Sequence, residues 1–336
     1  MKKLLGKVID KQDLTEEESM KVMGYITSGE ASNIFIASML TALRMKGETA
    51  TEITGFIKVM REKVSRIHVK TTSPILDIVG TGGDNANTFN ISSLSAIVAA
   101  GAGITVAKHG SRSVTSKCGS AEVFASLGVN LEAGPKVLEQ ALRDVGIAFL
   151  FAPGLHPAMK HVMPVRSELK IRTVFNILGP LANPAFADTM VVGVYSAELT
   201  RLFAEVLRNV GVKRAFVVYG NDGTDEISLT TTTRAVSLID GELKEVIINP
   251  AEYGFSLVVA SELKGGDPEQ NKEIALSILS GEGGPKREIV VLNAGVAIAL
   301  CLPKVDINEG IELAKESIDS GHALQKLNEL IEITNG

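Results

Sequence analysis

The sequence has no tryptophan, and aromatic residues make up only 4% of its 336 residues. A surface that binds single-stranded nucleic acid needs aromatic rings on which bases stack, and this chain supplies few of them. An excess of positive charge is also missing, since 39 acidic residues outnumber 34 basic ones and the formal net charge is −5. These two absences argue against a nucleic-acid-binding protein. A phosphorylated small molecule stays compatible with the charge balance, because a few Lys and Arg side chains suffice to bind one.

Cysteines and long apolar runs are also scarce. The two cysteines, Cys118 and Cys301, allow at most one disulfide, which favours a reducing compartment. The longest uncharged apolar-rich run, residues 94–107, is too short to span a bilayer. Charged residues from Asp10 onward replace the apolar core of a signal peptide. We therefore expect a cytoplasmic protein without a membrane partner.

The first part of the chain, up to about residue 65, has the apolar spacing of helices. Thr15 with Glu18, and Thr49 with Glu52, have the spacing of capping boxes at helix starts. A helix between them is predicted from Ile36, Met39, Leu40 and Leu43, with Gly47 suited to its C-terminal cap. Three amphipathic helices with no strand between them predict a small helical subdomain. Its methionine-rich stripe fits either core packing or a dimer surface.

Beyond Thr71 short apolar runs alternate with helical segments. We expect strands at 75–79, 104–107, 147–151, 190–195 and 215–219, and helices at 92–102, 199–210 and 309–319. Apolar strands alternating with helices indicate a parallel sheet covered on both faces. Asp240-Gly241, a type I′ turn signal, predicts a hairpin of strands 235–239 and 243–248. The expected fold is α/β, with a small all-helical subdomain plus a larger domain whose mainly parallel central sheet is flanked by helices.

A glycine-rich segment follows the first predicted strand. Gly80, Gly82 and Gly83 precede Asp84 and allow the backbone amides to come close to a ligand such as a phosphate. The segment is not a dinucleotide fingerprint, because residue 85 is Asn instead of Gly, and it lacks the Gly-Lys-Ser/Thr of a Walker loop. A purely structural turn is the alternative.

Polar residues follow or flank other predicted elements. Residues 90–93 (Asn-Ile-Ser-Ser) precede a helix, where Ser92 or Ser93 serves either as a simple N-cap or within an anion site. Residues 108–113 (Lys-His-Gly-Ser-Arg-Ser) are expected to form a loop after a strand. They are either a solvated charge cluster or part of one site shared with the glycine loop, since open α/β sheets bind ligands at strand ends.

Carboxylates and an isolated arginine complete the candidate set. Asp225 and Glu226 follow the strand at 215–219 and offer hard oxygen ligands of the kind that Mg²⁺ takes, with an ordinary Asx turn as the alternative. Arg166 has a planar fork that suits a carboxylate, although a surface salt bridge explains it equally well.

Taken together, these motifs closely resemble the anthranilate phosphoribosyltransferase family of tryptophan biosynthesis. The matching stretches are residues 80–84, 90–93, 108–120, 156–166, 172–181 and 225–226. The resemblance implies transfer of phosphoribose from phosphoribosyl pyrophosphate (PRPP) to the amine of anthranilate. It also implies a homodimer formed by a helical subdomain of residues 1–70 plus about 163–187, and a PRPP-binding α/β domain of residues 71–162 plus about 188–336.

The resemblance also implies roles for individual residues. The catalytic set is Lys108, Asp84 and Arg166. The PRPP set is Gly80, Gly83, Asp84, Thr88, Asn90, Ile91, Ser92, Ser93, Lys108, His109, Gly110, Ser111, Arg112, Ser113, Val114, Thr115, Ser116 and Ser120. The anthranilate set is Gly80, Ser111 and Arg166, and the metal set, for two Mg²⁺ ions, is Ser92, Asp225 and Glu226. For His109, late proton acceptance and packing are both compatible with the sequence.

One residue departs clearly from the family pattern. Ser111 stands where the family has Asn on the anthranilate side of the site, and Ser93 and Glu122 are milder changes from Thr and Asp. A different aromatic amine as acceptor is therefore an alternative. A pyrimidine nucleoside phosphorylase would use free phosphate and need no Asp-Glu pair, and a nucleic-acid-binding relative should be basic and lack these motifs.

Overall fold

The structure is a computed structural model that describes residues 1–84, 86–113 and 117–336. Four helices open the chain: α1 (Lys2–Ile9), α2 (Glu16–Ser28), α3 (Asn33–Lys46) and α4 (Ala50–Lys63). Both predicted capping boxes are present, Thr15 with Glu18 and Thr49 with Glu52. The prediction of three helices missed α1, which has no capping side chain and buries only Val8 fully.

The larger part of the chain is built on one seven-stranded sheet, in the order β3-β2-β1-β4-β5-β6-β7. Its strands are β1 (Ile75–Gly80), β2 (Thr105–Gly110), β3 (Ile147–Phe151), β4 (Thr189–Gly193), β5 (Arg214–Gly220), β6 (Thr233–Ile239) and β7 (Glu242–Ile248). The first five in this order are parallel, and β6 and β7 are antiparallel. Asp240 and Gly241 both have positive φ, 47° and 93°, as the predicted type I′ turn requires.

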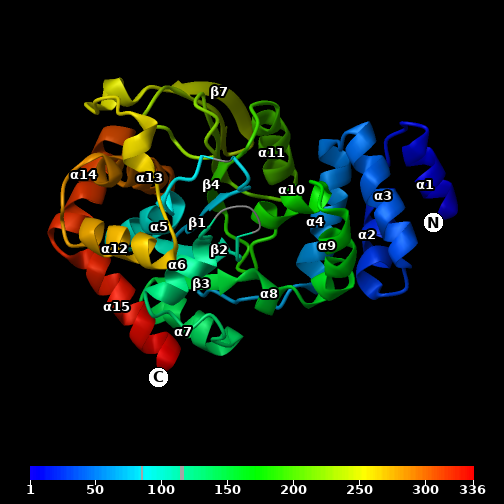
Figure 1. Ribbon diagram of the computed structural model, residues 1–336, viewed down its shortest axis with the longest axis horizontal. Coiled ribbons are helices and arrows are strands. Elements are labelled where there is room, and N and C mark those ends of the chain that lie inside the picture. Colours follow the sequence, from blue (N-terminus) through cyan, green and yellow to red (C-terminus); the bar gives the residue numbers. More distant parts are fainter. Residues whose placement is uncertain (85, 114–116) are drawn as a thin grey trace.

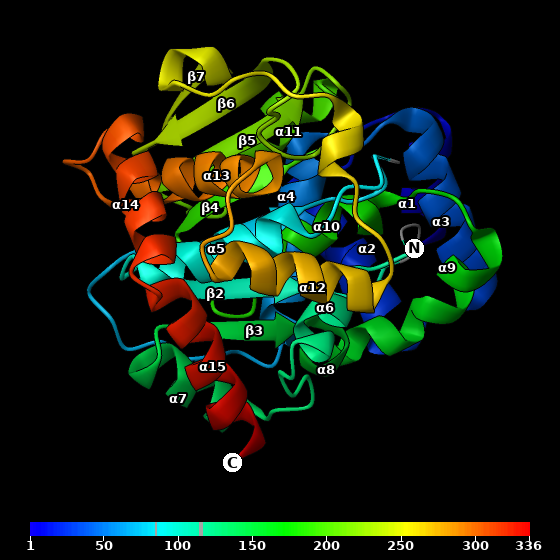
Figure 2. The same ribbon diagram turned by 60° about the vertical axis from the view of Figure 1, so that its left-hand side comes forward.

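Helices cover both faces of the sheet (Figures 1 and 2). The helices that follow the N-terminal four are α5 (Ile91–Gly101), α6 (Ser120–Ser126), α7 (Pro135–Asp144), α8 (Ala152–Leu155), α9 (Met163–Leu169), α10 (Val174–Leu181), α11 (Glu198–Asn209), α12 (Pro268–Leu279), α13 (Pro285–Cys301), α14 (Ile307–Asp319) and α15 (His322–Asn335). Short 3₁₀ helices span Pro157–His161 (η1), Pro250–Tyr253 (η2) and Ala260–Leu263 (η3). The expected α/β architecture with a helical bundle is confirmed.

The sheet separates two hydrophobic cores. Val191 of β4 packs in the core that contains α5, α13 and α15, whereas its neighbours Met190 and Val192 pack in the core that contains α1–α4, α10 and α11. Successive strand residues point to opposite faces, so a strand buried on both sides is mostly apolar. This explains why the central strands lack a regular polar alternation, although β1 and β2 bury Asp77, Lys108 and His109.

The segment that contains α9 and α10 packs against the N-terminal helices, although about 100 residues of the chain separate them (Figure 1). Helix α9 contacts α3, and α10 contacts α3 and α4. Across the three described ranges, no helix is long and apolar enough to cross a membrane.

Candidate active site

Two loops meet at the carboxyl ends of the parallel strands. The glycine loop follows β1, and residues 221–226 follow β5. The amide of Gly82 donates a hydrogen bond to Asp225 Oδ2 over 2.7 Å. A Cβ atom at Gly80 would lie 2.4 Å from the same oxygen, and one at Gly193 would lie 1.5 Å from the carbonyl oxygen of Asp225. Glycine is therefore needed at these positions for Asp225 to lie against the ends of β1 and β4.

The carboxylates at this edge lie near one another. Glu226 Oε1 accepts a hydrogen bond from the amide of Ser92 over 3.2 Å, at the start of α5. Asp84 Oδ1 accepts from the amide of Ala86, while its Oδ2 is buried with no hydrogen-bond partner in the described residues. Burial and the nearby Asp84 charge raise the pKa of Asp225 to about 7. Burial, then the charges of Asp225 and Asp84, raise the pKa of Glu226 well above its usual value.

These carboxylates fit a divalent cation. No three His, Cys, Asp or Glu side chains in the described ranges already converge as a complete metal cluster. Mg²⁺, however, usually takes only one or two protein carboxylates and completes its shell with water and phosphate oxygens. A cation here would stabilise the ionised form of Asp225, whose pKa is raised first by burial and then by the Asp84 charge, and the unpartnered Asp84 Oδ2 would gain a positive neighbour.

Lys108 and His109 are not in the expected loop. Strand β2 continues through Gly110, and Lys108 and His109 are only 2% and 3% exposed, which also contradicts the solvated-cluster alternative for these two residues. Lys108 Nζ donates to the carbonyl of His109 over 2.9 Å. Burial lowers the pKa of Lys108, and the negative charges of Asp77, Glu226 and Asp225 oppose that shift. These negative charges favour a cationic Lys108 beside the acidic edge, the group formed by Asp84, Asp225 and Glu226.

His109 makes contacts that favour a structural role. Its Nε2 lies 3.3 Å from Nε2 of His156, so one of the two rings donates a hydrogen bond and the other accepts it. Burial, then His156 and Lys108, lower the pKa of His109 well below its usual value. The ring is therefore neutral, and it packs against a second buried imidazole.

Asp77 and Asn183 form a buried pair next to this part of β2, and the sequence analysis assigned neither residue a role. Asp77 Oδ1 accepts from the amide of His109 over 3.0 Å, and its Oδ2 accepts from Asn183 Nδ2 over 2.7 Å. Asn183 Nδ2 also donates to the carbonyl of Ala107 over 2.8 Å. Burial raises the pKa of Asp77 to about 6. An acidic residue inside the apolar run 75–79 was the signal that could have identified Asp77.

The segment after β2 is held by its own helix. The carbonyl of Ser111 accepts from Ser120 Oγ over 3.3 Å and from the amide of Ala121 over 3.2 Å. Glu122 Oε2 accepts from the amides of Ser113 and Gly119, and its Oε1 lies 3.8 Å from Arg112. The candidates Val114, Thr115 and Ser116 lie outside the described residues.

The residues around the start of α5 differ in part from expectation. Asn90, instead of Ser92 or Ser93, is the N-cap residue, and its side chain donates to the carbonyl of Cys118 and accepts from Asn271. Ser93 Oγ is buried without a partner in the described part of the chain, and Ile91 is buried. Thr88 forms an isolated antiparallel bridge with Lys264. These contacts join the start of α5 and the residues before it to Cys118 and to residues 264 and 271.

Arg166 lies on α9, on the helical side of the molecule. Among the residues that the structure describes, it forms no ion pair, so the surface salt bridge is not observed. Its guanidinium lies 5.7 Å from the Phe175 ring centre and 3.9 Å from the sulfur of Met163, and burial lowers its pKa. No hydrogen bond or ion pair joins Arg166 to Asp84, Asp225 or Glu226 in the described ranges. Arg172, which sequence reasoning did not assign, donates to the carbonyl of Gly83 and stacks 4.1 Å over Tyr195.

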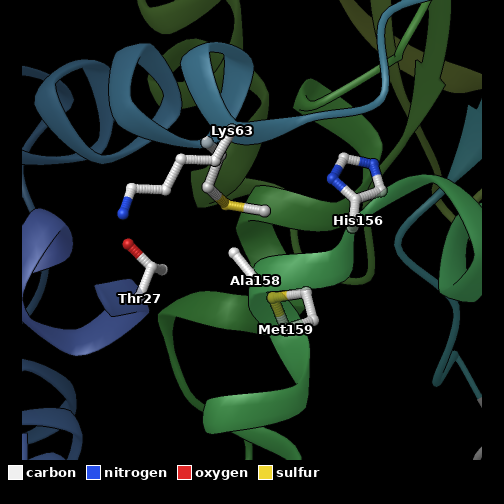
Figure 3. Close-up of a pocket in the computed structure, with 6 residues that line it drawn as sticks. Thr27, Lys63, His156, Ala158 and Met159 are labelled. Carbon is white, nitrogen blue, oxygen red and sulfur yellow. The ribbon is translucent and has the colours of Figure 1, made fainter. Parts of the chain in front are cut away.

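A small pocket lies between the helical bundle and η1 (Figure 3). It is lined by Thr27, Met60, Lys63, His156, Ala158 and Met159, and the Lys63 amine points toward Thr27. Its free volume of about 10 Å³ has room for about one water molecule. The pocket is therefore too small for a substrate, although it shares His156 with the network beneath β2.

Comparisons with known proteins agree over the whole chain. The model of a glycosyl transferase family α/β domain matches residues 72–324, and that of the family's helical bundle domain matches residues 2–64. The anthranilate phosphoribosyltransferase of Geobacter sulfurreducens is 49% identical, covering 100% of this chain and 99% of that protein.

Solved structures show the same likeness. The enzyme of that name from Thermus thermophilus is 41% identical, with a TM-score of 0.93 and 99% of each chain covered. The Saccharomyces cerevisiae enzyme in complex with PRPP and Mg is 30% identical, with a TM-score of 0.86 over 98% of this chain and 93% of that chain. Its complex with 4-fluoroanthranilate is 29% identical, with a TM-score of 0.88 over 98% and 97%. With its motifs, fold and relatives in agreement, the chain belongs to the anthranilate phosphoribosyltransferase family.

Proposed function

We propose that this chain transfers the phosphoribosyl group of PRPP to the amine of anthranilate, giving N-(5-phosphoribosyl)anthranilate and pyrophosphate, the second step of tryptophan synthesis from chorismate. The observation that carries this proposal is the meeting of the glycine loop with Asp225 and Glu226 at the strand ends. Open α/β sheets bind ligands at that edge. The S. cerevisiae relative is in complex with PRPP and Mg, and with 4-fluoroanthranilate, on the same fold.

The reaction needs charge stabilisation more than it needs a strong base. The amine nitrogen attacks C1 of the ribose, the bond from C1 to the pyrophosphate oxygen breaks, and the nitrogen loses a proton. Because the aryl amine is already neutral at pH 7, no base is required before attack. Negative charge grows on the pyrophosphate, and the Lys108 ammonium, fixed by its bond to the carbonyl of His109, stabilises it electrostatically. The burial of His109 and its contact with His156 support positioning over proton transfer.

PRPP is assigned to the loops around the glycine segment. The glycine loop at Gly80 and Gly83, the start of α5 at Asn90, and Ser111 to Ser113 offer donors to phosphate and ribose oxygens. Asp84, with one unpartnered oxygen, is suited to a role beside the ribose or a bound cation. The PRPP-binding residues are Gly80, Gly83, Asp84, Thr88, Asn90–Ser93, Lys108–Ser113 and Ser120, together with Val114, Thr115 and Ser116 outside the described residues.

Magnesium is assigned to Asp225, Glu226 and Ser92. Their oxygens would hold two Mg²⁺ ions, which neutralise pyrophosphate charge when bound. The raised pKa of both carboxylates supports this, because burial and the neighbouring negative charges disfavour their ionised forms and a bound cation would compensate for both effects. Gly82 and Ser92 donate backbone hydrogen bonds that orient these carboxylates toward the loop.

Anthranilate is assigned to Gly80, Ser111 and Arg166. Arg166 is partly buried and keeps its fork free of ion pairs within the described ranges, so a carboxylate would find a prepared partner. Ser111 is exposed, and its backbone carbonyl, not its side chain, holds the turn. Within the described residues the hydroxyl makes no hydrogen bond, so it is suited to face an acceptor.

We also propose the assembly and location of the protein. The helical subdomain comprises residues 1–70 plus about 163–187, in line with the packing of α9 and α10 on α3 and α4. Ile9, Ile34 and Met45 on its helices are 60%, 80% and 78% exposed, which supports a homodimer formed through it. Cys118 and Cys301 are buried free thiols, in keeping with a cytoplasmic location.

Anthranilate fluorescence tests the function directly. The purified chain mixed with PRPP and Mg²⁺ should quench anthranilate fluorescence and release one pyrophosphate per anthranilate consumed. Ser111, which replaces the family Asn, favours one second candidate, a different aromatic amine as acceptor. If the chain releases pyrophosphate only with another aryl amine, the acceptor is wrong and the PRPP assignment stands.

A further inference from the structure

A second cleft lies at the end of the sheet opposite the candidate active site. It has a volume of about 400 Å³ and is formed by the start of β5, the end of α13 and the residues that lead into α14. Strand β5 runs from Arg214 at this cleft to Gly220 beside the acidic edge, and six steps of about 3.3 Å separate the two by about 20 Å. The cleft is thus distinct from the candidate active site, and its volume falls in the range of small-molecule sites.

The walls of the cleft are mainly apolar. Six of its lining residues present aromatic or aliphatic side chains: Phe216, Ile239, Tyr253, Leu300, Val305 and Ile307. They come from β5, β6, η2, α13, the link from α13 to α14, and α14, so the sheet and two packed helices shape the cleft. Figure 2 shows α13 and α14 beside the strands β5 to β7. Walls of this composition accommodate the ring of a small organic molecule.

Arg214 supplies a cation at one side of these walls. Its Nε is buried and has no hydrogen-bond partner, and its side chain enters no ion pair in the described part of the chain. A buried donor without a partner costs free energy until something accepts from it. An anionic group in the cleft would accept hydrogen bonds from this guanidinium, whose planar fork of donors matches a carboxylate.

The nearby carboxylates are already committed elsewhere. Asp188 accepts from the amide of Ile75 over 3.0 Å and pairs with Lys213 over 3.3 Å. Asp306, at the rim of the cleft, accepts from the amide of Glu309 over 2.9 Å as the N-cap of α14. Neither lies within ion-pair distance of Arg214. The guanidinium therefore keeps its capacity for an external anion.

We propose that this cleft binds a small aromatic carboxylate, with its carboxylate on the Arg214 guanidinium and its ring against Phe216 and Tyr253. The ligand is a monoanion with an apolar body, because one cation faces otherwise apolar walls and Asp306 at the rim disfavours a second negative charge. A neutral ligand of the same shape would leave Arg214 unpaired, so it binds more weakly.

Titration calorimetry with 3-phenylpropionate tests the site. The wild-type chain should bind this probe with a dissociation constant in the millimolar range or below, and its neutral amide, 3-phenylpropanamide, at least tenfold more weakly. Arg214→Gln should weaken binding of the acid at least tenfold and leave the weak binding of the amide unchanged. Thermal unfolding of Arg214→Gln verifies that the variant is folded.

Two further variants keep the test decisive. Arg166→Gln should bind the probe as the wild type does, whereas loss of binding there would place the probe at the proposed anthranilate position and overturn the inference. Asn308→Trp adds a bulky ring at an exposed lining position, and it should block the cleft even if Arg214→Gln fails to fold. No binding to the wild type at 10 mM probe, or equal binding to wild type and Asn308→Trp, would also reject the site.

Discussion

Asp77 holds the amide of His109 on the neighbouring strand through a hydrogen bond of 3.0 Å that joins residues 32 positions apart. The same carboxylate accepts from Asn183 and lies within the field of Lys108. One acidic side chain, fully buried inside an apolar strand, thus fixes the end of β2 from which Lys108 and the following loop extend toward the acidic edge.

The buried Asp77 should make stability depend on pH in a specific direction. Its pKa is raised from 3.8 to about 6 in the folded chain, so the folded state holds this proton more tightly than the unfolded state. The stabilisation from the proton is complete below pH 4 and is lost as pH rises through 6, and it amounts to about 3 kcal/mol. Asp77→Asn removes this contribution.

Urea unfolding of wild type and Asp77→Asn at pH 4 and pH 7 measures it. The wild type should gain stability relative to the variant on going from pH 7 to pH 4. Comparison of the two proteins cancels other titrations, including that of His156, whose pKa burial lowers to about 4 and which acts in the opposite direction. A difference between the proteins that stays constant with pH would show that Asp77 titrates normally.

Arg166→Lys should raise the Michaelis constant for anthranilate tenfold or more, and raise that for PRPP less. Lysine keeps the charge but cannot form two parallel hydrogen bonds to a carboxylate, and a charge-assisted hydrogen bond is worth about 1.5–3 kcal/mol. Steady-state kinetics with each substrate varied would separate the effects. Arg201→Lys, in an exposed pair with Glu205, is the matched control and should change neither constant. Equal increases for both substrates would remove Arg166 from this role.

Asp225→Asn combined with Glu226→Gln should lower turnover by orders of magnitude and leave the fold intact. The amide oxygens can still accept from Gly82 and Ser92, so the loop keeps its hydrogen bonds while the negative charge is lost. Mn²⁺ binding followed by electron paramagnetic resonance, with PRPP present, gives a readout independent of turnover. Normal activity at saturating Mg²⁺ would contradict the metal assignment. Glu205→Gln combined with Glu312→Gln, which removes two negative charges from helix-surface ion pairs, serves as the charge-matched control.

Ser111→Asn should lower the Michaelis constant for anthranilate by about tenfold or less and barely change that for PRPP. The Asn side chain restores a longer arm with an acceptor and two donors, and one neutral hydrogen bond is worth about 0.5–1.5 kcal/mol. Because the Ser111 side chain is exposed, the substitution should not disturb packing. Kinetics of wild type, Ser111→Asn and Ser111→Ala with anthranilate and other aryl amines would decide. A wild type that ignores anthranilate but accepts another amine would point to a changed acceptor.

Gly193→Ala should displace Asp225 and Glu226 although it replaces no charged residue. The added methyl would lie 1.5 Å from the carbonyl oxygen of Asp225, so the loop that carries Asp225 and Glu226 must shift. We expect a loss of about 1–3 kcal/mol of stability together with weaker metal binding. Thermal unfolding and metal titration measure both effects. Gly24→Ala, inside helix α2 and with nothing within 4 Å of the new atom, is the control: it should leave metal binding unchanged and raise stability by about 0.5–1 kcal/mol, because alanine favours a helix more than glycine does.

Local signals in the sequence predicted most of the fold. Capping boxes, apolar strands and the Asp240-Gly241 turn depend on neighbouring residues, and each is present in the structure. The helix α1 escaped prediction because it lacks a capping side chain and a broad apolar face. The polar sequence after Ala107 suggested a loop, since a buried lysine is stable only with partners that a local pattern does not show.

The candidate site was predictable only where its residues form motifs. The glycine loop and the Asp225-Glu226 pair follow strands, so topology alone predicts that they lie at one edge. Asn183 and Arg172 carry no such signal, because their partners, Asp77 and Gly83, lie 106 and 89 positions away. Pairings over such distances depend on how the whole chain packs.

The long sequence separation of these contacts affects the stage of folding at which the site forms. The hydrogen bonds from Gly82 to Asp225 and from Ser92 to Glu226 close loops of 143 and 134 residues. Closing such loops carries an entropic cost that only later packing offsets, so contacts of this kind form late in folding. During synthesis the glycine loop emerges long before its acidic partners. A growing or truncated chain therefore has no assembled acidic edge, and the capacity for catalysis arises with the last stage of folding.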